Sequence, residues 1–389
     1  MSHYDVLIVG AGLAGLRCAG LLARRGLSVG LVDRKQSPSD AIHTTGIFVR
    51  KTLEDFDLPE DCLGPPLRDV TLYSPARRPL LLKSPHDEFR VGRMGRLYQR
   101  LLDDAQDAGV AWMPGTSFLE ATLDTARHSV TLQTRGSPRS IETRFLIGAD
   151  GAQSRVAGTL ALDKNREWIV GLEDVYDGAS AQGPPQLRCF LEPKLAPGYI
   201  AWIVCDGCET HVGVGGYPKR FNPAEALDRF QGSIGDLIDL GSAKKIERRG
   251  GRIPVGGILR RIASAHGLLA GDAAGAVSPL TAGGLDACMR LSTLAADVTA
   301  DFLESGDPAA LSRYSGRYFQ SRFVSRRAMR RMLATVGSRW ALETVCAALR
   351  LPGMRALAQA VFFARGSFPD PPASHERAGL VRAGAYGTD

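Results

Sequence analysis

The 389-residue chain lacks an uninterrupted apolar run near the 18 residues that a membrane-spanning helix needs. It begins almost directly with YDVLIVG, which is too short and too polar at its flanks for the apolar region of a secretory signal. Cysteine is scarce, and the seven present are an odd number, so at least one is unpaired within the chain. We therefore expect a cytoplasmic protein in a reducing compartment.

Clustered metal ligands are also lacking. Cys205 and Cys208 form a C-x-x-C pair, but the Asp206-Gly207 between them signals a two-residue hairpin turn, across which the cysteines would face one another. The pair has neither the helix N-terminus that activates a thiol nor a second ligand pair. Three histidines in apolar surroundings stand alone in the sequence: His43, His211 and His266. The sequence predicts no metal site.

Acidic residues are almost absent from Arg313 to Arg365, where Glu343 is the only one. The same segment contains Arg317, Arg322, Arg326, Arg327, Arg330, Arg331, Arg339, Arg350 and Arg355. A basic, partly amphipathic segment of this kind can bind an anionic membrane surface or a phosphate-bearing ligand, or it can be a solvated helical face. We expect no nucleic-acid partner, because no nucleic-acid-binding module is recognisable.

What is present is typical of a globular α/β protein, with 44% apolar and 23% charged residues. The pattern predicts a strand, a glycine turn, a helix and a second strand over 4–34, and an amphipathic helix ending at Gly109. Four apolar runs between 167 and 218 predict successive strands of a mostly antiparallel sheet. A short helix capped by Asn222 follows, and 285–304 and 309–365 are helical by pattern.

Three glycines near the N-terminus give the first functional signal. Gly10, Gly12 and Gly15 form G-x-G-x-x-G, which permits a sharp turn, brings the backbone to a pyrophosphate and lets helix and strand pack closely. The following helix N-terminus favours phosphate, and Asp33 ends the second strand, where its carboxylate can accept from ribose hydroxyls. The predicted dinucleotide site comprises Gly10, Ala11, Gly12, Ala14, Gly15, Asp33 and Arg34. Arg34 is either a surface residue or an adenine-side contact.

Two further loops indicate which dinucleotide is bound. FLIGADGAQSRV ends a strand at Asp150-Gly151, and GLLAGDAAGAVSPLTAGGLDACM ends another at Gly271-Asp272 before a helix. An NAD-binding domain does not need these extra strand ends. An extended FAD does, because its ribityl chain and isoalloxazine ring run past several loops. We therefore predict FAD.

The three motifs in this order resemble the flavoprotein family that includes para-hydroxybenzoate-hydroxylase-type monooxygenases and geranylgeranyl reductases, over residues 1 to about 305. The resemblance implies that Asp272 binds ribityl hydroxyls and that Arg93 lies near the pyrophosphate. It also implies that Pro279 to Leu285 pass under the flavin pyrimidine, where bare N–H groups at a helix start favour the negative charge of reduced flavin. The further FAD contacts implied are Thr45, Gly46, Arg93, Asp150, Gly151, Gly271, Asp272, Pro279, Gly283, Gly284 and Leu285.

Details of the later motifs favour the reductase branch. Gly-Asp-Ala-Ala-Gly followed by SPLTAGGL is similar to geranylgeranyl reductases, whereas aromatic hydroxylases tend to have His in place of the last glycine. Tyr199 and Trp202 resemble the aromatic strand over the flavin in that branch, although they can equally be ordinary core aromatics. Thr45-Gly46 occupies the position where reductases of this branch often have Cys-Gly, so this chain has no cysteine that could act there.

The predicted fold is α/β, with a Rossmann-like FAD-binding domain of glutathione-reductase type, an interleaved antiparallel-sheet substrate domain and a helical C-terminal region. The predicted FAD-binding domain comprises 1–70, 91–160 and 262–305, and the predicted substrate domain comprises 71–90 and 161–261. A helical region is predicted over 306–368 and a loose tail over 369–389.

The functional hypothesis is reduction of carbon–carbon double bonds in an apolar or prenyl substrate, by hydride from flavin N5 with NAD(P)H as donor. The alternatives are an FAD-dependent monooxygenase acting on an aromatic or polyketide-like natural product, and a non-catalytic FAD-binding subunit. No side chain is identified as catalytic.

Overall fold

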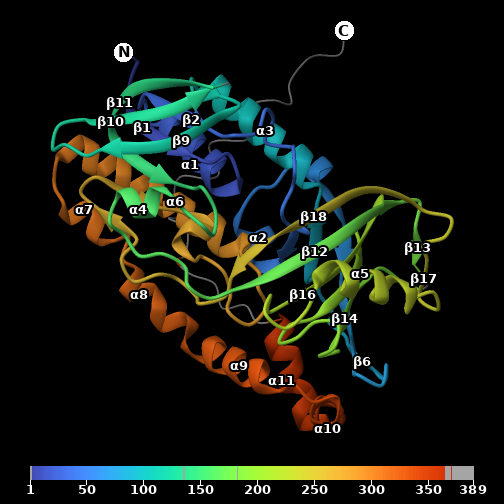
Figure 1. Cartoon of the computed structure of the whole chain (residues 1–389). Coiled ribbons are helices and arrows are strands. Elements are labelled where there is room, and N and C mark those ends of the chain that lie inside the picture. The colour runs from blue at the N-terminus through green and yellow to red at the C-terminus, as the bar shows by residue number, and fades with distance from the viewer. Residues whose placement is uncertain (1, 135, 182, 364–368, 370–389) are drawn as a thin grey trace.

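An eight-stranded sheet forms the upper part of the molecule in Figure 1. The computed structural model describes residues 2–134, 136–181, 183–363 and Pro369. The sheet consists of β1 (His3–Val9), β2 (Val29–Val32), β8 (Ala111–Met113), β9 (Thr116–Thr122), β10 (His128–Thr134), β11 (Ser137–Gly148), β19 (Ala263–Ser264) and β20 (Gly267–Leu269). Its central order β20-β11-β1-β2-β8 is parallel, and β9, β10 and β19 add antiparallel pairs.

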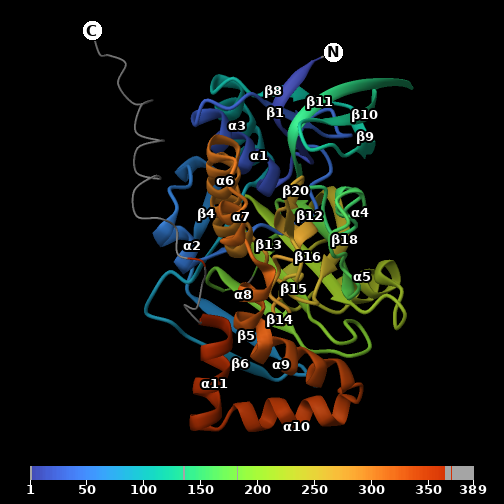
Figure 2. The same cartoon turned by 90° about the vertical axis from the view of Figure 1, so that its left-hand side faces the viewer.

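The parallel strands are apolar because helices cover them. Val6, Leu7 and Ile8 of β1 are fully buried, as a strand covered on both faces requires. The covering helices are α1 (Leu13–Arg24), α3 (Met94–Asp107) and α6 (Leu285–Ser305). Helix α1 packs against both α3 and α6, and these helices lie together in Figure 2.

A seven-stranded sheet forms the second layer, in the order β18-β12-β16-β15-β14-β5-β6. Its strands are β5 (Asp69–Tyr73), β6 (Pro79–Leu82), β12 (Trp168–Asp177), β14 (Gln186–Phe190), β15 (Ala201–Cys205), β16 (Glu209–Gly216) and β18 (Lys244–Pro254). All neighbours are antiparallel except β14 and β5, which confirms the mostly antiparallel sheet predicted from the sequence. Helix α5 (Pro223–Gly232) contacts β12 and β16 and is capped by the Asn222 side chain, as predicted.

Smaller elements connect the two sheets. The strands β3 (Ile47–Val49), β4 (Leu63–Leu67) and β7 (Phe89–Gly92) form a three-stranded sheet, and β13 (Ser180–Ala181) pairs with β17 (Ile238–Asp239). The remaining short helices are α2 (Arg50–Asp55), η1 (Glu60–Cys62), α4 (Val156–Thr159) and η2 (Gly271–Ala274). The expected domain limits at 70/71 and 90/91 fall inside β5 and β7, and the chain changes from the three-stranded to the seven-stranded sheet between β4 and β5.

The hairpin at the C-x-x-C pair forms, but one residue away from the predicted turn. Asp206 N–H donates to the Glu209 carbonyl at 2.9 Å, so Gly207 and Cys208 occupy the centre of the turn. Cys205 pairs with Thr210 rather than with Cys208. The expectation that the cysteines face one another is therefore wrong. The Asp206 side chain sets the turn, because its Oδ1 accepts from the N–H groups of Cys208 and Glu209.

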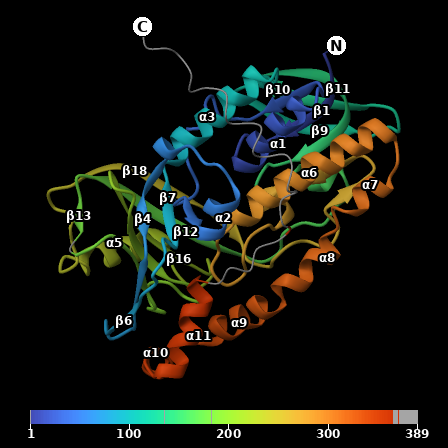
Figure 3. The same cartoon turned by 180° about the vertical axis from the view of Figure 1, so that it is seen from behind.

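Short helices form one edge of the molecule after α6, and Figure 3 shows them running away from the eight-stranded sheet. They are α7 (Ala309–Ser312), α8 (Gly316–Gln320), η3 (Ser321–Phe323), α9 (Val324–Thr335), α10 (Arg339–Leu349) and α11 (Pro352–Phe363). The predicted helical character over 309–365 is thus correct for the described part of that range, with breaks between the helices. The predicted loose tail lies outside the described residues, apart from Pro369.

The α/β fold class predicted from the sequence is confirmed: a Rossmann-like layer, an interleaved mostly antiparallel sheet and a helical C-terminal region. Among the described helices, none combines the length and apolar character needed to cross a bilayer.

Substituting Gly15 tests the contact on which the first layer depends. A Cβ at Gly15 would lie 1.8 Å from the Gly10 carbonyl oxygen, so Gly15→Ala forces helix α1 away from the loop after β1. We expect a loss of about 1–3 kcal/mol in the free energy of unfolding, measured by urea denaturation. Gly12→Ala is the matched control, because a Cβ there meets no atom within 4 Å. Equal loss in both variants would contradict the packing role.

Candidate functional site

A cavity of about 1600 Å³ lies among the two sheets and the C-terminal helices. The sequence-predicted residues that line it are Gly10, Gly12, Ala14, Asp33, Arg34, Thr45, Gly46, Asp150, Gly151, Tyr199, Trp202, Gly271, Asp272, Gly283, Gly284 and Leu285. Ligand sites typically occupy about 300–1,000 Å³, so the space exceeds that of one small ligand. The cavity therefore has room for a dinucleotide and a second molecule.

Four predicted residues lie outside the lining. Gly15 packs under the loop against Gly10, and Ala11 is buried with its N–H donated to Asp33 Oδ2 at 2.7 Å. Pro279 is buried between the lining residues Ser278 and Leu280. Arg93 points elsewhere: its guanidinium lies 3.3 Å from the Asp61 carbonyl and 3.2 Å from Cys208 Sγ. The expected proximity of Arg93 to a pyrophosphate is thus not a feature of this cavity.

The first loop presents bare main chain to the cavity. Gly10 has φ of +105° and lies so close to Ala149 that a Cβ would be 2.3 Å from its carbonyl oxygen. Gly12 precedes α1 and has open space where a side chain would be. Asp33 accepts from the Ala11 and Lys35 N–H groups, which fixes its carboxylate at the end of β2. A phosphate can therefore approach the N-terminus of α1 while a hydroxyl approaches Asp33.

The second and third loops join the first because their strands are neighbours. Ala149 N–H donates to Val9 at the end of β1, and Ala270 N–H donates to Gly148 at the end of β11. Asp150 Oδ2 caps helix α4 by accepting from Arg155 and Val156, while burial raises the pKa of the Asp150 carboxyl. Three loops separated by more than 100 residues thus meet at the carboxyl ends of adjacent parallel strands, as ligand sites in such sheets do.

Asp272 supplies a carboxylate beside the start of α6. Burial raises its pKa to about 6, and Gly284 at the helix start lies next to its Oδ1. Helix α6 is 21 residues long, and its N-cap Gly284 uses no side-chain cap. The first N–H groups of α6 therefore face the cavity together with the Asp272 carboxylate. Hydrogen-bond donors of a bound molecule stabilise the charged form of this carboxylate. A polyol chain and an anionic ring edge fit these two features.

Tyr199 and Trp202 lie over the cavity because β16 makes room for them. Their rings contact edge to face with centroids 6.4 Å apart, and the Tyr199 hydroxyl donates to the Thr281 carbonyl at 2.7 Å. A Cβ at Gly215 would lie 2.6 Å from the Tyr199 ring, and one at Gly213 would lie 2.2 Å from the Trp202 ring. Trp202 is thus a packed residue of β15, Tyr199 lies just before that strand, and both line the cavity.

A buried polar cluster around Glu173 was missed by the sequence reasoning. Glu173 Oε2 accepts from Thr45 Oγ1 at 2.5 Å and from Trp202 Nε1 at 3.2 Å, across Gly213. Its Oε1 lies 3.5 Å from His211 Nδ1 and 3.8 Å from Arg249 Nη1. Burial alone would raise the pKa of Glu173, but His211, Thr45 and Arg249 outweigh it and hold the pKa below its usual value. An acid inside an apolar strand was the available signal.

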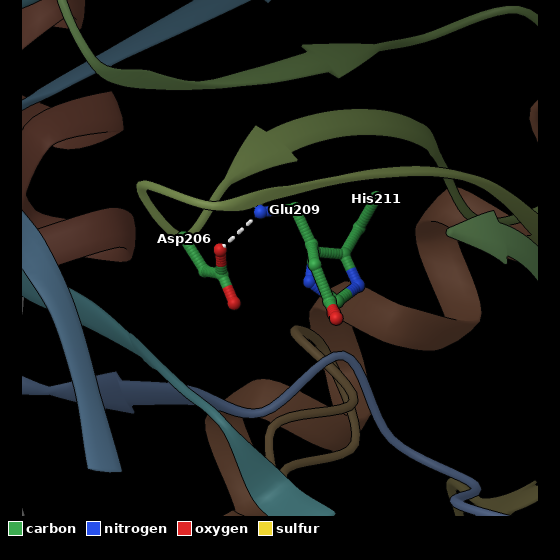
Figure 4. Close-up of side chains that lie close together, drawn as sticks. All are labelled: Asp206, Glu209 and His211. Atoms are coloured by element: carbon green, nitrogen blue, oxygen red, sulfur yellow. Dashed lines mark hydrogen bonds between the residues drawn. The ribbon is translucent and has the colours of Figure 1, made fainter. Parts of the chain in front are cut away.

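His211 is not isolated, contrary to the sequence-based prediction. Figure 4 shows its ring beside Glu209 and Asp206 at the β15–β16 hairpin, and one ligand-type atom from each lies within 4.8 Å of the others. Arg249 is also close, 4.0 Å from Glu209 Oε2. The histidine thus joins the hairpin to the Glu173 cluster. His43 lines the cavity and contacts the Gly250 carbonyl at 2.9 Å, and His266 packs edge to face on His128.

Comparison with known proteins identifies the class. A family model described as an FAD binding domain matches residues 3–177, which contain the first loop, Asp33 and the Asp150-Gly151 loop. The protein is therefore a flavoprotein, and FAD is its cofactor. The bare cradle at Gly12, the fixed Asp33 and the exposed start of α6 fit this group.

Relatives with assigned functions narrow the class. The chain is 28% identical over 355 residues to digeranylgeranylglycerophospholipid reductase 1 of Methanopyrus kandleri, covering 85% of this chain and 91% of the relative. It is 27% identical to geranylgeranyl diphosphate reductase of Rhodobacter capsulatus, covering 79% and 78%. A geranylgeranyl bacteriochlorophyll reductase-like structure from Thermoplasma acidophilum has a TM-score of 0.80 at 21% identity, covering 92% and 96%. The protein is an FAD-dependent oxidoreductase that is similar to the geranylgeranyl reductases.

Replacing Asp272 separates folding from cofactor binding. Burial raises the pKa of Asp272 to about 6 in the folded protein. Ionisation of this carboxyl therefore lowers the free energy of unfolding as the pH rises from about 4 to above 6. FAD-free Asp272→Asn should therefore have a higher melting temperature than FAD-free wild type at pH 7 and an equal one near pH 4. Its affinity for FAD should fall about tenfold or more, since a charge-assisted hydrogen bond is lost. Thermal melts and FAD titration measure the two effects.

Asp163→Asn serves as the control for the FAD titration, because Asp163 pairs with Arg261 outside the cavity. Its affinity for FAD should equal that of wild type. If Asp272→Asn binds FAD as tightly as this control, Asp272 is not part of the FAD-binding site.

Replacing Glu173 tests the buried cluster. Glu173→Gln removes the buried carboxylate beside Arg249 and His211, while Arg249 keeps its 2.8 Å ion pair with Glu247, so we expect a loss of about 2 kcal/mol in the free energy of unfolding at pH 7. Thr45→Val removes one hydrogen bond to the same carboxylate, keeps the branched shape of the side chain and should cost about 1 kcal/mol. Urea denaturation measures both. Because the folded pKa of Glu173 is lowered, the wild-type advantage should disappear as the pH falls below the usual range of a glutamic acid. A pH-independent difference would contradict the charge argument.

Proposed function

We propose that the protein reduces carbon–carbon double bonds of an apolar or prenyl chain. The observation that carries the proposal is a cavity that has the dinucleotide cradle as one wall and many apolar side chains in its other walls. The second sheet and the C-terminal helices contribute lining residues such as Leu72, Leu187, Leu191, Leu342, Val361 and Phe362. An extended hydrocarbon gains by leaving water for such a surface. The names of the reductases that resemble this chain support the same substrate class.

In this proposal FAD held in the cavity would supply a hydride from N5 to one alkene carbon, and a proton from solvent would add to the other carbon. The residues of the chain bind and orient. The loops at Gly12, Asp33 and Asp272 hold the dinucleotide, while Tyr199 and Trp202 form the wall that positions the substrate chain. The bond from Tyr199 to Thr281 ties this wall to the loop before α6. The apolar lining excludes water from the reacting carbons, which limits competing reactions.

The electron donor and the location complete the proposal. NAD(P)H is the proposed source of the hydride, because FAD must be reduced again after each turnover. The arginines of the C-terminal helices support peripheral binding to an anionic membrane, where a prenyl lipid substrate resides.

Anaerobic turnover tests the reaction. Purified holoprotein is mixed with NADPH and geranylgeranyl diphosphate without oxygen, and the masses of the products are measured by mass spectrometry. We expect flavin bleaching by NADPH and products heavier by two hydrogen atoms for each double bond reduced.

The same mixture in air is the control for the alternatives. Substrate-dependent oxygen uptake with an oxygen atom in the product would establish a monooxygenase instead. A bound flavin that neither NADPH nor NADH reduces, together with an unchanged substrate under dithionite, would favour a non-catalytic FAD subunit.

A further inference from the structure

We infer that the cavity opens between helices α9, α10 and α11 onto the surface that binds an anionic bilayer, so that a prenyl chain passes from the membrane directly into the cavity. The inference rests on the proposed function for the identity of that chain.

Exposed apolar side chains are concentrated on the C-terminal helices. Of ten large apolar side chains that are strongly exposed among the described residues, eight lie between 318 and 357. They are Tyr318, Val324, Met332, Trp340, Val345, Leu351, Met354 and Leu357. Trp340 is the most exposed of them, at 78%. We call these eight residues the apolar edge. Such a concentration marks an interaction site, because scattered single residues are the normal case.

Three residues of the apolar edge also line the cavity. Met332 of α9, Val345 of α10 and Leu357 of α11 are 65%, 46% and 52% exposed, and each is part of the cavity wall. A side chain that faces both bulk solvent and the cavity stands at an opening. The opening is therefore rimmed by one apolar residue from each of three helices. An apolar rim offers water no hydrogen-bond partner, whereas a hydrocarbon chain lowers its free energy by leaving water for such a surface.

The charge around the opening identifies what it faces. Residues 313–363 contain ten arginines and one acid, Glu343. Arg322 and Arg326 line the cavity beside the rim, and Arg331 is exposed one residue before Met332. Cationic side chains interleaved with Trp, Leu and Met are the composition of an interfacial helix on anionic lipid. A second copy of the chain would bring arginines against arginines, which favours the bilayer over a dimer.

The position of the helices suits this partner. Helices α9 to α11 form an outer edge in all three views, at the far end from the strands β1 and β11 (Figures 1, 2 and 3). Trp340 is the second residue of α10 and Leu351 directly precedes α11, and both side chains are strongly exposed, so both can enter a flat surface. The cavity then extends from the membrane surface to the dinucleotide cradle.

Vesicle binding tests the docking surface. The FAD-loaded full-length protein is sedimented with phosphatidylcholine vesicles, with and without phosphatidylglycerol. We expect binding to the anionic vesicles that weakens as salt rises, and about tenfold weaker binding for Trp340→Ser and for Leu351→Ser. Arg331→Glu should lose affinity for anionic vesicles only. The matched control is Ile246→Ser in β18, 43% exposed and away from the apolar edge, which should bind as wild type.

Chain transfer tests the entrance. Anionic vesicles containing geranylgeraniol are incubated with the protein and removed, and protein-bound geranylgeraniol is measured by mass spectrometry. Leu357→Glu places a charge on the rim and also weakens vesicle binding, so geranylgeraniol is counted per protein bound to vesicles. This ratio should fall at least tenfold, while FAD content changes little. Ile246→Ser again serves as the control. Neither readout needs turnover, so failure of the reductase proposal would leave both results interpretable.

Three outcomes would overturn the docking surface. The first is absence of vesicle binding at low salt. The second is equal loss in Ile246→Ser and Trp340→Ser. The third is a dimer in solution that Trp340→Ser dissociates, since the apolar edge would then be an interface between copies. Vesicle binding with unchanged geranylgeraniol uptake in Leu357→Glu would overturn the entrance.

Discussion

The close approach of main chain to main chain at three strand ends is the constraint on which the structure depends. Gly15 packs on Gly10, and Gly10 packs on Ala149, at separations that no side chain would allow. The contacts are possible because β1, β11 and β20 are parallel neighbours, so their carboxyl ends reach the same edge. The cradle for FAD follows from this packing. It is built of N–H groups and small residues, and the flavin carries the redox chemistry.

In the second sheet, glycines make room for aromatic side chains. Gly213 and Gly215 of β16 leave the space that the Trp202 and Tyr199 rings occupy. Gly213 also lets the Trp202 indole reach Glu173 on the next strand. A buried acid is held ionised there by Thr45, His211 and Arg249, and Thr45 belongs to the loop that lines the FAD side of the cavity. The two layers are therefore linked by polar contacts at the point where cofactor and substrate would meet.

The C-terminal helices close the cavity on its third side and leave an apolar rim exposed. Their arginines are part of the structure as well as of its surface. Arg330 stacks on the rings of Tyr199 and Tyr217, and Arg326 donates to Ser278 in the loop before α6. The basic composition therefore combines internal contacts near the cavity with an outward cationic face. These two roles alternate along the same helices.

The sequence alone determined the features that depend on neighbours along the chain. The glycine motif, Asp33 at the end of β2, the helix start at Gly284 and the Asn222 cap are local patterns, and they identified the FAD class and the order of the elements. Only the tertiary structure decided which residues meet across strands. Glu173 lies opposite Arg249 on β18 and diagonal to His211 on β16, although 76 and 38 residues separate them in the chain. Strand register sets such contacts, and register depends on the packing of the whole sheet. Arg93 contacts the Asp61 carbonyl of η1 and Cys208 of the β15–β16 hairpin, and only the tertiary structure brings these two groups next to it.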